Sequence, residues 1–282
     1  MPRLPFNLKI AALGLLLSHA ACRPDQPPVQ EKPAAAPVSG VAAPPGARPA
    51  ANPADTLHLP GGQVAQLRPG TAAAFRQLPA SGLPDLPNEP SAEPLASAQG
   101  KVRRQGLDLF LLTAQGGEVK LTSTPDASFT LQNADGVKYM YWGSLPAAHQ
   151  WVVRAWYWES SGTVLVDQRT GRRLELIGDP VASPDGRQVL LTSPGLGGGD
   201  QANLLELVEI EAAGPRLRWR REPATWEAEE ARWAAPGRAM LKLRHLNAQG
   251  EMPDDVPETY AELDLNGAGA GASPAGLAPA HR

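Results

Sequence analysis

Cys22 is the only cysteine among the 282 residues, and it follows a short apolar run. Arg3 and Lys9 supply positive charge before the run, which extends from Ile10 to Leu17, and Ser, Ala and Ala occupy positions 18, 20 and 21. This order of charge, apolar core and small residues is typical of a secretory signal, and the run is too short to span a bilayer. A lone thiol at this boundary is a nucleophile that can accept a lipid.

Residues 1–21 resemble a bacterial lipoprotein signal, in which cleavage leaves the cysteine as the new N-terminus. The resemblance implies that Cys22 carries a diacylglyceryl group and holds the protein on a membrane of the cell envelope, at its periplasmic or surface face. His19 stands where that family prefers an apolar residue. The alternative is a plain secretory signal cleaved after Ala20 or Ala21, which would leave Cys22 as a thiol.

Other groups that could do chemistry are spread along the chain. A hydrolase that uses paired carboxylates would need two of them about 5 to 9.5 Å apart. The candidates are Asp167, Asp185, Asp200 and Glu159. Because Asp167 and Asp185 fall in separate turns, we expect them not to meet.

Histidine spacing gives no sign of a metal site. His149 and His245 are far apart in sequence, and no metal-binding spacing or nucleophile elbow occurs around them. The sequence therefore predicts no catalytic residue, no metal and no cofactor.

The loop from Gly195 to Asn203 contains three consecutive glycines followed by Asp200. Its backbone amides could approach an anion, or its oxygens could surround calcium. It lacks the Lys-Ser/Thr of a phosphate-binding loop and the spacing of an EF-hand. We interpret it as a flexible insertion between two strands, with Asp200 and Asn203 as the candidate loop site.

Aromatic side chains crowd one stretch and form the second candidate surface. Its members are Trp142, Trp151, Trp156 and Trp158. Exposed aromatic rings stack on sugars or anchor a protein partner, whereas buried ones pack between sheets. A glycan-binding role requires that Trp156 or Trp158 be exposed to solvent.

Four arginines at positions 216, 218, 220 and 221 could be mistaken for a nucleic-acid patch. A four-residue turn at 212–215 would place Glu211 opposite Arg216, Glu209 opposite Arg218, and Val208 opposite Trp219 on the other face. With a net charge of -3, we expect ion pairs on a strand face and no nucleic-acid partner.

A β-rich domain at 101–265 must position these groups. No window of comparable strength there has helical period, and strand-like runs end at turn residues. The runs are 107–113, 118–123, 137–142, 150–158, 163–167, 173–177, 188–192, 204–211 and 239–245.

The runs are separated by recurring turns: a hairpin from Val166 to Leu176, the turn Ser183-Pro-Asp-Gly-Arg187, and Pro236-Gly237, which is similar to that turn. These turns resemble those of TolB-like and WD40-like β-propeller blades and of envelope proteins that share them. The resemblance implies an all-β fold of antiparallel four-stranded meander units. Gly171 suits a turn that needs positive φ.

The units number about three, which is fewer than a propeller needs. We find four strands at 138–178 and at 180–222, three at 230–265, and a hairpin at 107–122. The alternatives are an open stack, a compactly closed assembly, or completion by another chain. We favour the closed form, in which the hairpin at Leu107 pairs with the last sheet. Uncovered edges favour a homodimer.

Flanking segments are poor in large apolar residues. Residues 22–100 are rich in Pro and Ala, which predicts a disordered tether, and 266–282 predict a Gly/Ala tail. A segment at 57–78 could dock on the domain, with Thr71 as helix N-cap and Phe75 and Leu78 as anchors.

Together these features predict a lipid-anchored, non-enzymatic envelope protein. Its β domain would bind a protein partner or support an envelope assembly. The alternatives are a glycan-binding module that uses the aromatic stretch, and a carboxylate-dependent hydrolase.

Overall fold

The computed structural model describes residues 56–59, 64–86, 92–133, 135–198, 201–253, 255 and 257–265. The signal, Cys22, the first part of the predicted tether and the 266–282 tail lie outside these residues. The described part is all-β, with one short helix and a few turns of 3-10 helix.

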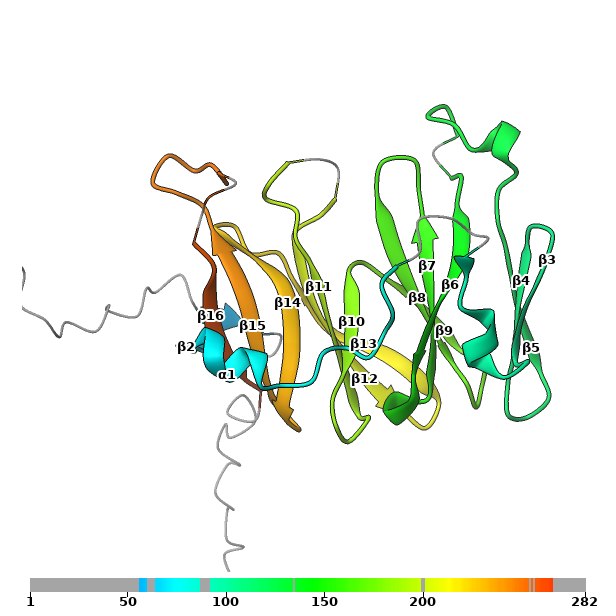
Figure 1. The fold of residues 1–282 in the computed structure, drawn as a ribbon, viewed down its shortest axis with the longest axis horizontal. Coiled ribbons are helices and arrows are strands. Elements are labelled where there is room, and N and C mark those ends of the chain that lie inside the picture. Colours follow the sequence, from blue (N-terminus) through cyan, green and yellow to red (C-terminus); the bar gives the residue numbers. More distant parts are fainter. Residues whose placement is uncertain are drawn as a thin grey trace, which may run out of the picture. The chain divides into compact units, whose positions relative to one another are not determined.

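The strands of the described residues form four antiparallel sheets (Figure 1). The first sheet contains β3 (Val102–Gln105), β4 (Asp108–Leu112) and β5 (Glu118–Thr122). The second contains β6 (Lys138–Leu145), β7 (Gln150–Trp156), β8 (Ser161–Asp167) and β9 (Arg173–Leu176). The third contains β10 (Asp179–Ala182), β11 (Gln188–Ser193), β12 (Leu204–Glu211) and β13 (Gly214–Arg221).

The fourth sheet joins the two ends of the folded region. Its C-terminal strands are β14 (Trp226–Ala235), β15 (Arg238–His245) and β16 (Thr259–Asp264). Two N-terminal strands, β1 (Thr56–His58) and β2 (Val64–Pro69), complete it, because β2 pairs antiparallel with β16. The short helices are α1 (Ala72–Arg76), η4 (Leu95–Ala98), η5 (Asp126–Ser128) and η6 (Pro146–Ala148).

Three hydrophobic clusters join the sheets in chain order. One cluster lies between the first and second sheets, another between the second and third, and another between the third and fourth. Alternation of side chains along each strand supplies these faces; in β4, for example, Leu109 and Leu111 are buried while Leu112 is exposed.

The prediction of a closed assembly of about three sheets is wrong. The hairpin at Leu107 does not pair with the last sheet: β4 pairs with β3 and β5 to give a separate sheet. Leu109, Leu111 and Leu121 pack instead against the second sheet, since they share a cluster with Val153. None of the clusters among the described residues links the first sheet to the fourth.

The folded region extends to the N-terminal side of residue 101. Leu57 and Leu67 are buried in the fourth sheet's core, and Phe75 of α1 is 2% exposed. Thr71 is the N-cap of α1, since its side chain accepts a hydrogen bond from the backbone N–H of Ala74. Leu57 and Leu67 therefore lie in the fourth sheet, and Phe75 packs against Tyr260 of β16, within the segment 57–78 that the sequence suggested could dock on the domain.

The hairpin of β12 and β13 has a tighter turn than predicted. Glu211 lies opposite Gly214, and a bulge at Leu207 and Val208 shifts the register. Trp219 therefore faces Leu207, not Val208. The predicted ion pairs are nevertheless present, because Arg216 reaches both Glu209 and Glu211, and Arg218 reaches Glu209. The arginines thus form a charged strand face.

Candidate functional site

Asp167 is a buried carboxylate at the end of β8. Its oxygens accept hydrogen bonds from the Arg169 side chain, from the backbone N–H groups of Arg169 and Thr170, and from Gln150. Burial opposes the negative charge, but these hydrogen bonds outweigh it and lower the pKa of Asp167 to about 2. The group holds the turn that contains Gly171, whose φ is 76° as predicted. The Asp167 carboxylate is charged, and both of its oxygens accept hydrogen bonds within the protein, which suits a structural role.

Asp185 caps the turn between β10 and β11. Its carboxylate accepts hydrogen bonds from the Ser183 hydroxyl and the Arg187 backbone N–H, and the Ser183 bond is the main cause of its lowered pKa. Glu159 is exposed in the loop after β7, and Asp200 lies outside the described residues. Asp167 and Asp185 are thus each committed to their own turn.

Among the residues that the structure describes, three other buried carboxylates connect segments of the chain, and they were not among the candidates predicted from the sequence. Glu206 in β12 accepts a hydrogen bond from the Ile177 backbone N–H, and Glu227 in β14 accepts one from Leu196. Glu93 accepts one from the Tyr141 backbone N–H. The available signal was an acidic residue at a position that strand alternation places inside, as Glu206 is between Leu204 and Val208.

Trp142 and Trp151 are buried, so the structure excludes them from an exposed aromatic surface. Trp142 lies between the second and third sheets, and its indole N–H donates a 2.8 Å hydrogen bond to the Pro84 carbonyl. Trp151 packs edge-on against Tyr141 on the opposite face of the second sheet, with 6.1 Å between the ring centroids. Both faces of this sheet are covered by other sheets, so these two aromatic side chains become part of the hydrophobic core.

Trp156 and Trp158 are exposed, at 37% and 50% of their surface. Trp158 contacts Phe129 with ring centroids 5.8 Å apart, and the Lys138 ammonium lies 5.3 Å from the Phe129 centroid. Lys138 is also the cross-strand partner of Trp156. We call Phe129, Trp156 and Trp158 the aromatic patch.

The Asn203 side chain does not contribute to a ligand site in the loop from Gly195 to Asn203, because its amide is used within the fold. Its amide donates to the carbonyls of Pro223 and Trp226, so it is buried between strands of the third and fourth sheets. The described part of the loop is also tied to its neighbours: the Gln201 side chain donates to the Ser161 carbonyl and accepts from its N–H. Asp200, the other predicted loop residue, lies outside the described residues.

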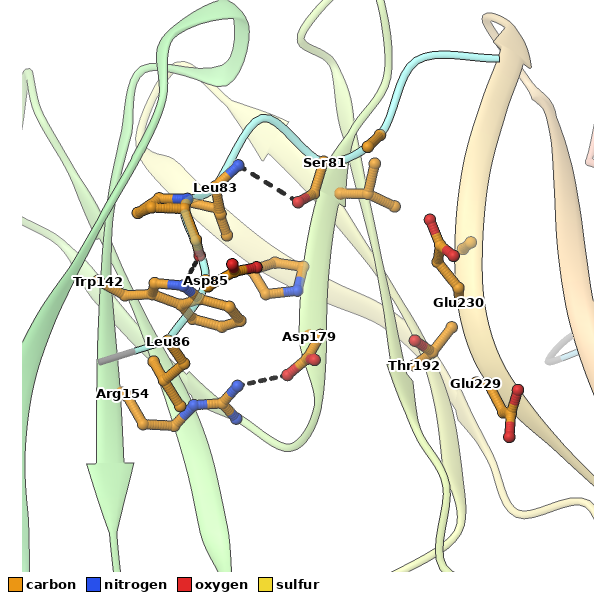
Figure 2. A pocket seen from close by; sticks show the side chains of 15 residues that line it. Ser81, Leu83, Asp85, Leu86, Trp142, Arg154, Asp179, Thr192, Glu229 and Glu230 are labelled. Atoms are coloured by element: carbon orange, nitrogen blue, oxygen red, sulfur yellow. Dashed lines mark hydrogen bonds and ion pairs between the residues drawn. The ribbon is translucent and has the colours of Figure 1, made fainter. Parts of the chain in front are cut away.

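A pocket of about 330 Å³ lies between the second, third and fourth sheets (Figure 2). The second sheet supplies Trp142 and Arg154, and the third supplies Asp179. The segment 80–86 forms one wall, and Arg154 points across the pocket to form an ion pair with Asp179. The Arg154 guanidinium also lies 4.3 Å from the Trp142 ring centroid. We call this cavity the inter-sheet pocket.

His149 and His245 lie in structural positions. His149 adopts the left-handed conformation at the end of η6, with φ 53°, and its carbonyl accepts a hydrogen bond from Gln168. The His245 ring lies 2.9 Å from the Thr259 hydroxyl. Over the residues that the structure describes, no cluster of three or more potential ligands could hold a metal ion.

Comparison with known proteins gives no relative from which a role could be inferred. No protein-family model matches the chain, and no curated protein is significantly similar to it. Within the described ranges, no helix is both long and apolar enough to cross a membrane.

Proposed function

We propose that this chain is a lipoprotein of the bacterial cell envelope, anchored through Cys22, whose β domain binds a protein partner and performs no catalysis. The charge, apolar run and small residues before Cys22 support the anchor. Two acyl chains would hold the domain stably on the membrane face, whereas one would hold it only marginally.

The observation that carries the binding role is the aromatic patch. Trp156 and Trp158 keep 37% and 50% of their surface in solvent, although burial of aromatic rings is strongly favourable. Tryptophan is also one of the residue types enriched among those that dominate binding energy in protein interfaces. The buried carboxylates, by contrast, hold turns and loops in place.

A glycan is the second candidate ligand of the same patch. Exposure of Trp156 and Trp158 meets the requirement stated for this role, because a sugar ring can stack on an exposed indole. Binding of soluble glycans that is lost in Trp158→Ala, without capture of any protein, would favour this candidate over the first.

We also propose that the sheets are propeller-type blades. The strands of the second and third sheets follow one another in order. The turn between β10 and β11 of the third sheet and the related turn between β14 and β15 of the fourth place Gly186 and Gly237 at φ 68° and 72°. β5 pairs with β4 on one side only and lies at the edge of the first sheet. Such an edge strand favours pairing with a second copy of the chain. Sedimentation of the full chain over a range of concentrations tests for the homodimer.

Labelling of cells with a palmitate analogue tests the anchor. The wild type should be labelled and Cys22→Ser should not; equal labelling would exclude lipidation.

Crosslinking in membranes tests the binding role. The wild type and the control Leu112→Ala, which changes an exposed side chain on the first sheet, should capture the same partner, and the double variant Trp156→Ala/Trp158→Ala should not. Capture that is unchanged in the double variant would contradict the assignment to the aromatic patch.

A further inference from the structure

Thr192 places a free hydroxyl in the wall of the inter-sheet pocket. The residue is 2% exposed, and its hydroxyl has no hydrogen-bond partner among the described residues. Unlike the Nε of Arg154, this oxygen is not sealed from the cavity. Thr163, which is as deeply buried, donates to the Gly178 carbonyl. Because a buried hydroxyl normally has a partner, the Thr192 oxygen marks a position for a ligand group.

Carboxylates outnumber cations in the lining of this pocket. Its charged members are one arginine and four acids, namely Arg154, Asp85, Asp179, Glu229 and Glu230. Cations of β14 and β15 pair with the two glutamates. Arg154 is paired with Asp179, and Asp85 has no ion pair among the described residues. The lining therefore carries a net negative charge, which favours a cation over an anion or a neutral ligand.

A β-bulge in β14 brings two consecutive acids to the pocket. The register of β14 and β15 shifts between Ala228 and Glu230, so Glu229 is the extra residue. Regular alternation would place Glu229 and Glu230 on opposite faces of the sheet, whereas both line the pocket. Bulges re-aim side chains in this way. The acidic lining is thus a product of the backbone as well as of composition.

Asp179 and Thr192 lie side by side in the third sheet. They are direct partners in the pairing of β10 with β11, so their side chains share one face. Figure 2 shows the Thr192 oxygen on the side of the cavity where Asp179 lies. Val181 follows on the same strand as Asp179 and lines the pocket, and Leu83 and Leu86 of the segment 80–86 line it as well. A donor to oxygen is therefore required next to an apolar part.

An ammonium on an alkyl chain has this combination of groups. Its N–H groups only donate, which matches carboxylates and a hydroxyl oxygen, and its carbons match the leucine and valine side chains. A metal ion fits less well, because no group of three or more potential ligands in the described ranges could hold one. A volume of about 330 Å³ lies at the lower end of the range for small-ligand pockets.

We propose that the inter-sheet pocket binds a primary alkylammonium group. The ammonium donates to the Thr192 hydroxyl and the Asp179 carboxylate, and the alkyl chain contacts Val181. Asp85, on the wall formed by 80–86, pairs with a second ammonium where the ligand is a diamine. A free amine and the lysine side chain of a partner offer the same chemistry. This site goes beyond the proposed function, since it depends neither on Cys22 nor on the aromatic patch.

Isothermal titration of the purified full chain at low salt tests the proposal. The probes are cadaverine and spermidine for free amines, pentylamine as a monoamine, and Nα-acetyl-lysine methylamide for a partner's lysine. The neutral 1,5-pentanediol is the uncharged comparison. At least one ammonium probe should bind with a dissociation constant of about 1 mM or lower, and pentanediol should not bind. Binding of the lysine probe alone would assign the site to a lysine side chain of a partner.

Thr192→Val removes the hydroxyl and preserves the shape of the side chain. It should weaken ammonium binding about fivefold or more, since a hydrogen bond to a charged group is lost. It should not lower the melting temperature, whereas Thr163→Val should, because only Thr163 uses its hydroxyl within the fold. A loss of stability in Thr192→Val equal to that in Thr163→Val would overturn the proposal.

Asp85→Asn tests the second contact without disturbing the core, because Asp85 is exposed. It should weaken cadaverine binding about threefold, as expected for an exposed ion pair, and affect pentylamine less. Asp108→Asn makes the same charge change on the first sheet and should leave binding unchanged.

Three results would overturn the site: no binding of any ammonium probe, equal binding of pentanediol, or equal weakening by Asp108→Asn and Asp85→Asn. Binding that is lost in Trp156→Ala/Trp158→Ala but survives Thr192→Val would also overturn it, and would place the amine on the aromatic patch. Capture of a protein partner through the patch is a separate measurement, so either proposal can fail alone.

Discussion

The carboxylate of Glu206 accepts a 2.9 Å hydrogen bond from the backbone N–H of Ile177, across the boundary between the third and second sheets. Its other oxygen is paired with Arg220 on β13. Glu227 repeats the arrangement one sheet further along, since it binds the Leu196 N–H and lies 3.5 Å from Arg244. A buried glutamate thus fixes the position of a loop on the preceding sheet.

Replacing Glu206 by alanine should destabilise the fold by about 2 to 3 kcal/mol, because the partly buried Ile177 N–H loses its acceptor and Arg220 loses its charge partner. Glu209→Ala on the same strand removes a partly exposed ion pair and should cost less than about 1 kcal/mol. Urea unfolding of both variants measures the difference. Equal losses would show that Glu206 does not hold the two sheets together.

Asp167 should make the stability of the protein depend on pH in the acid range. Its pKa is about 2 in the folded protein against 3.8 ordinarily, so its stabilisation is fully present above about pH 4 and is lost as the pH falls toward 2. The shift corresponds to about 2 kcal/mol at neutral pH. Urea unfolding of the wild type and Asp167→Asn from pH 7 to pH 2 should give a difference that shrinks over this window. A difference that is constant with pH would rule out this role.

Gly186 should tolerate no side chain. A Cβ atom there would lie 1.8 Å from the Ala147 carbonyl oxygen, and its φ is 68°. Gly250 provides a control with φ 80° and no atom within 4 Å of the added carbon. Gly250→Ala should cost about 1 to 2 kcal/mol for the left-handed backbone alone. Gly186→Ala should cost at least about 2 kcal/mol more, since the turn must separate from η6. Similar melting temperatures for the two variants would contradict this contact.

Removal of residues 1–100 should impair folding, although the sequence placed the domain boundary at residue 101. The truncation removes Leu57, Leu67 and Phe75, each worth about 1.5 to 3 kcal/mol through burial, and leaves β16 as an open edge. A chain that begins at residue 52 keeps them and should melt like the full-length protein. Circular dichroism and light scattering distinguish the two truncations. A soluble, cooperatively folded 101–282 chain would show that β1, β2 and α1 are dispensable.

Strand positions could be predicted because short apolar runs and turn residues are local signals. The units predicted at 138–178 and 180–222 correspond to the second and third sheets, which span β6 to β9 and β10 to β13. The turns at Gly171 and Gly186 were also predicted, since positive φ strongly favours glycine. The exact register of β12 and β13 was not, because a bulge depends on neighbouring packing.

The candidate sites, unlike the strand positions, could not be predicted from local sequence signals. The sequence identified aromatic crowding, but periodicity does not tell which face of a sheet another sheet covers. Only the packing of the second sheet between two others buries Trp142 and Trp151 and leaves Trp156 and Trp158 in solvent. The inter-sheet pocket draws on residues far apart in the chain, such as Asp85, Arg154 and Glu229.

By itself, the sequence determined the β-rich class, most strand positions and the local turn chemistry, because these depend on neighbours within a few residues. Tertiary structure decided the number of sheets, the recruitment of β1 and β2 to the C-terminal sheet, and the use of Glu206 and Glu227 as contacts between sheets. These features depend on strand pairing and burial between segments that are distant in the sequence. The residue pattern of one segment does not contain the energy of its contacts with another.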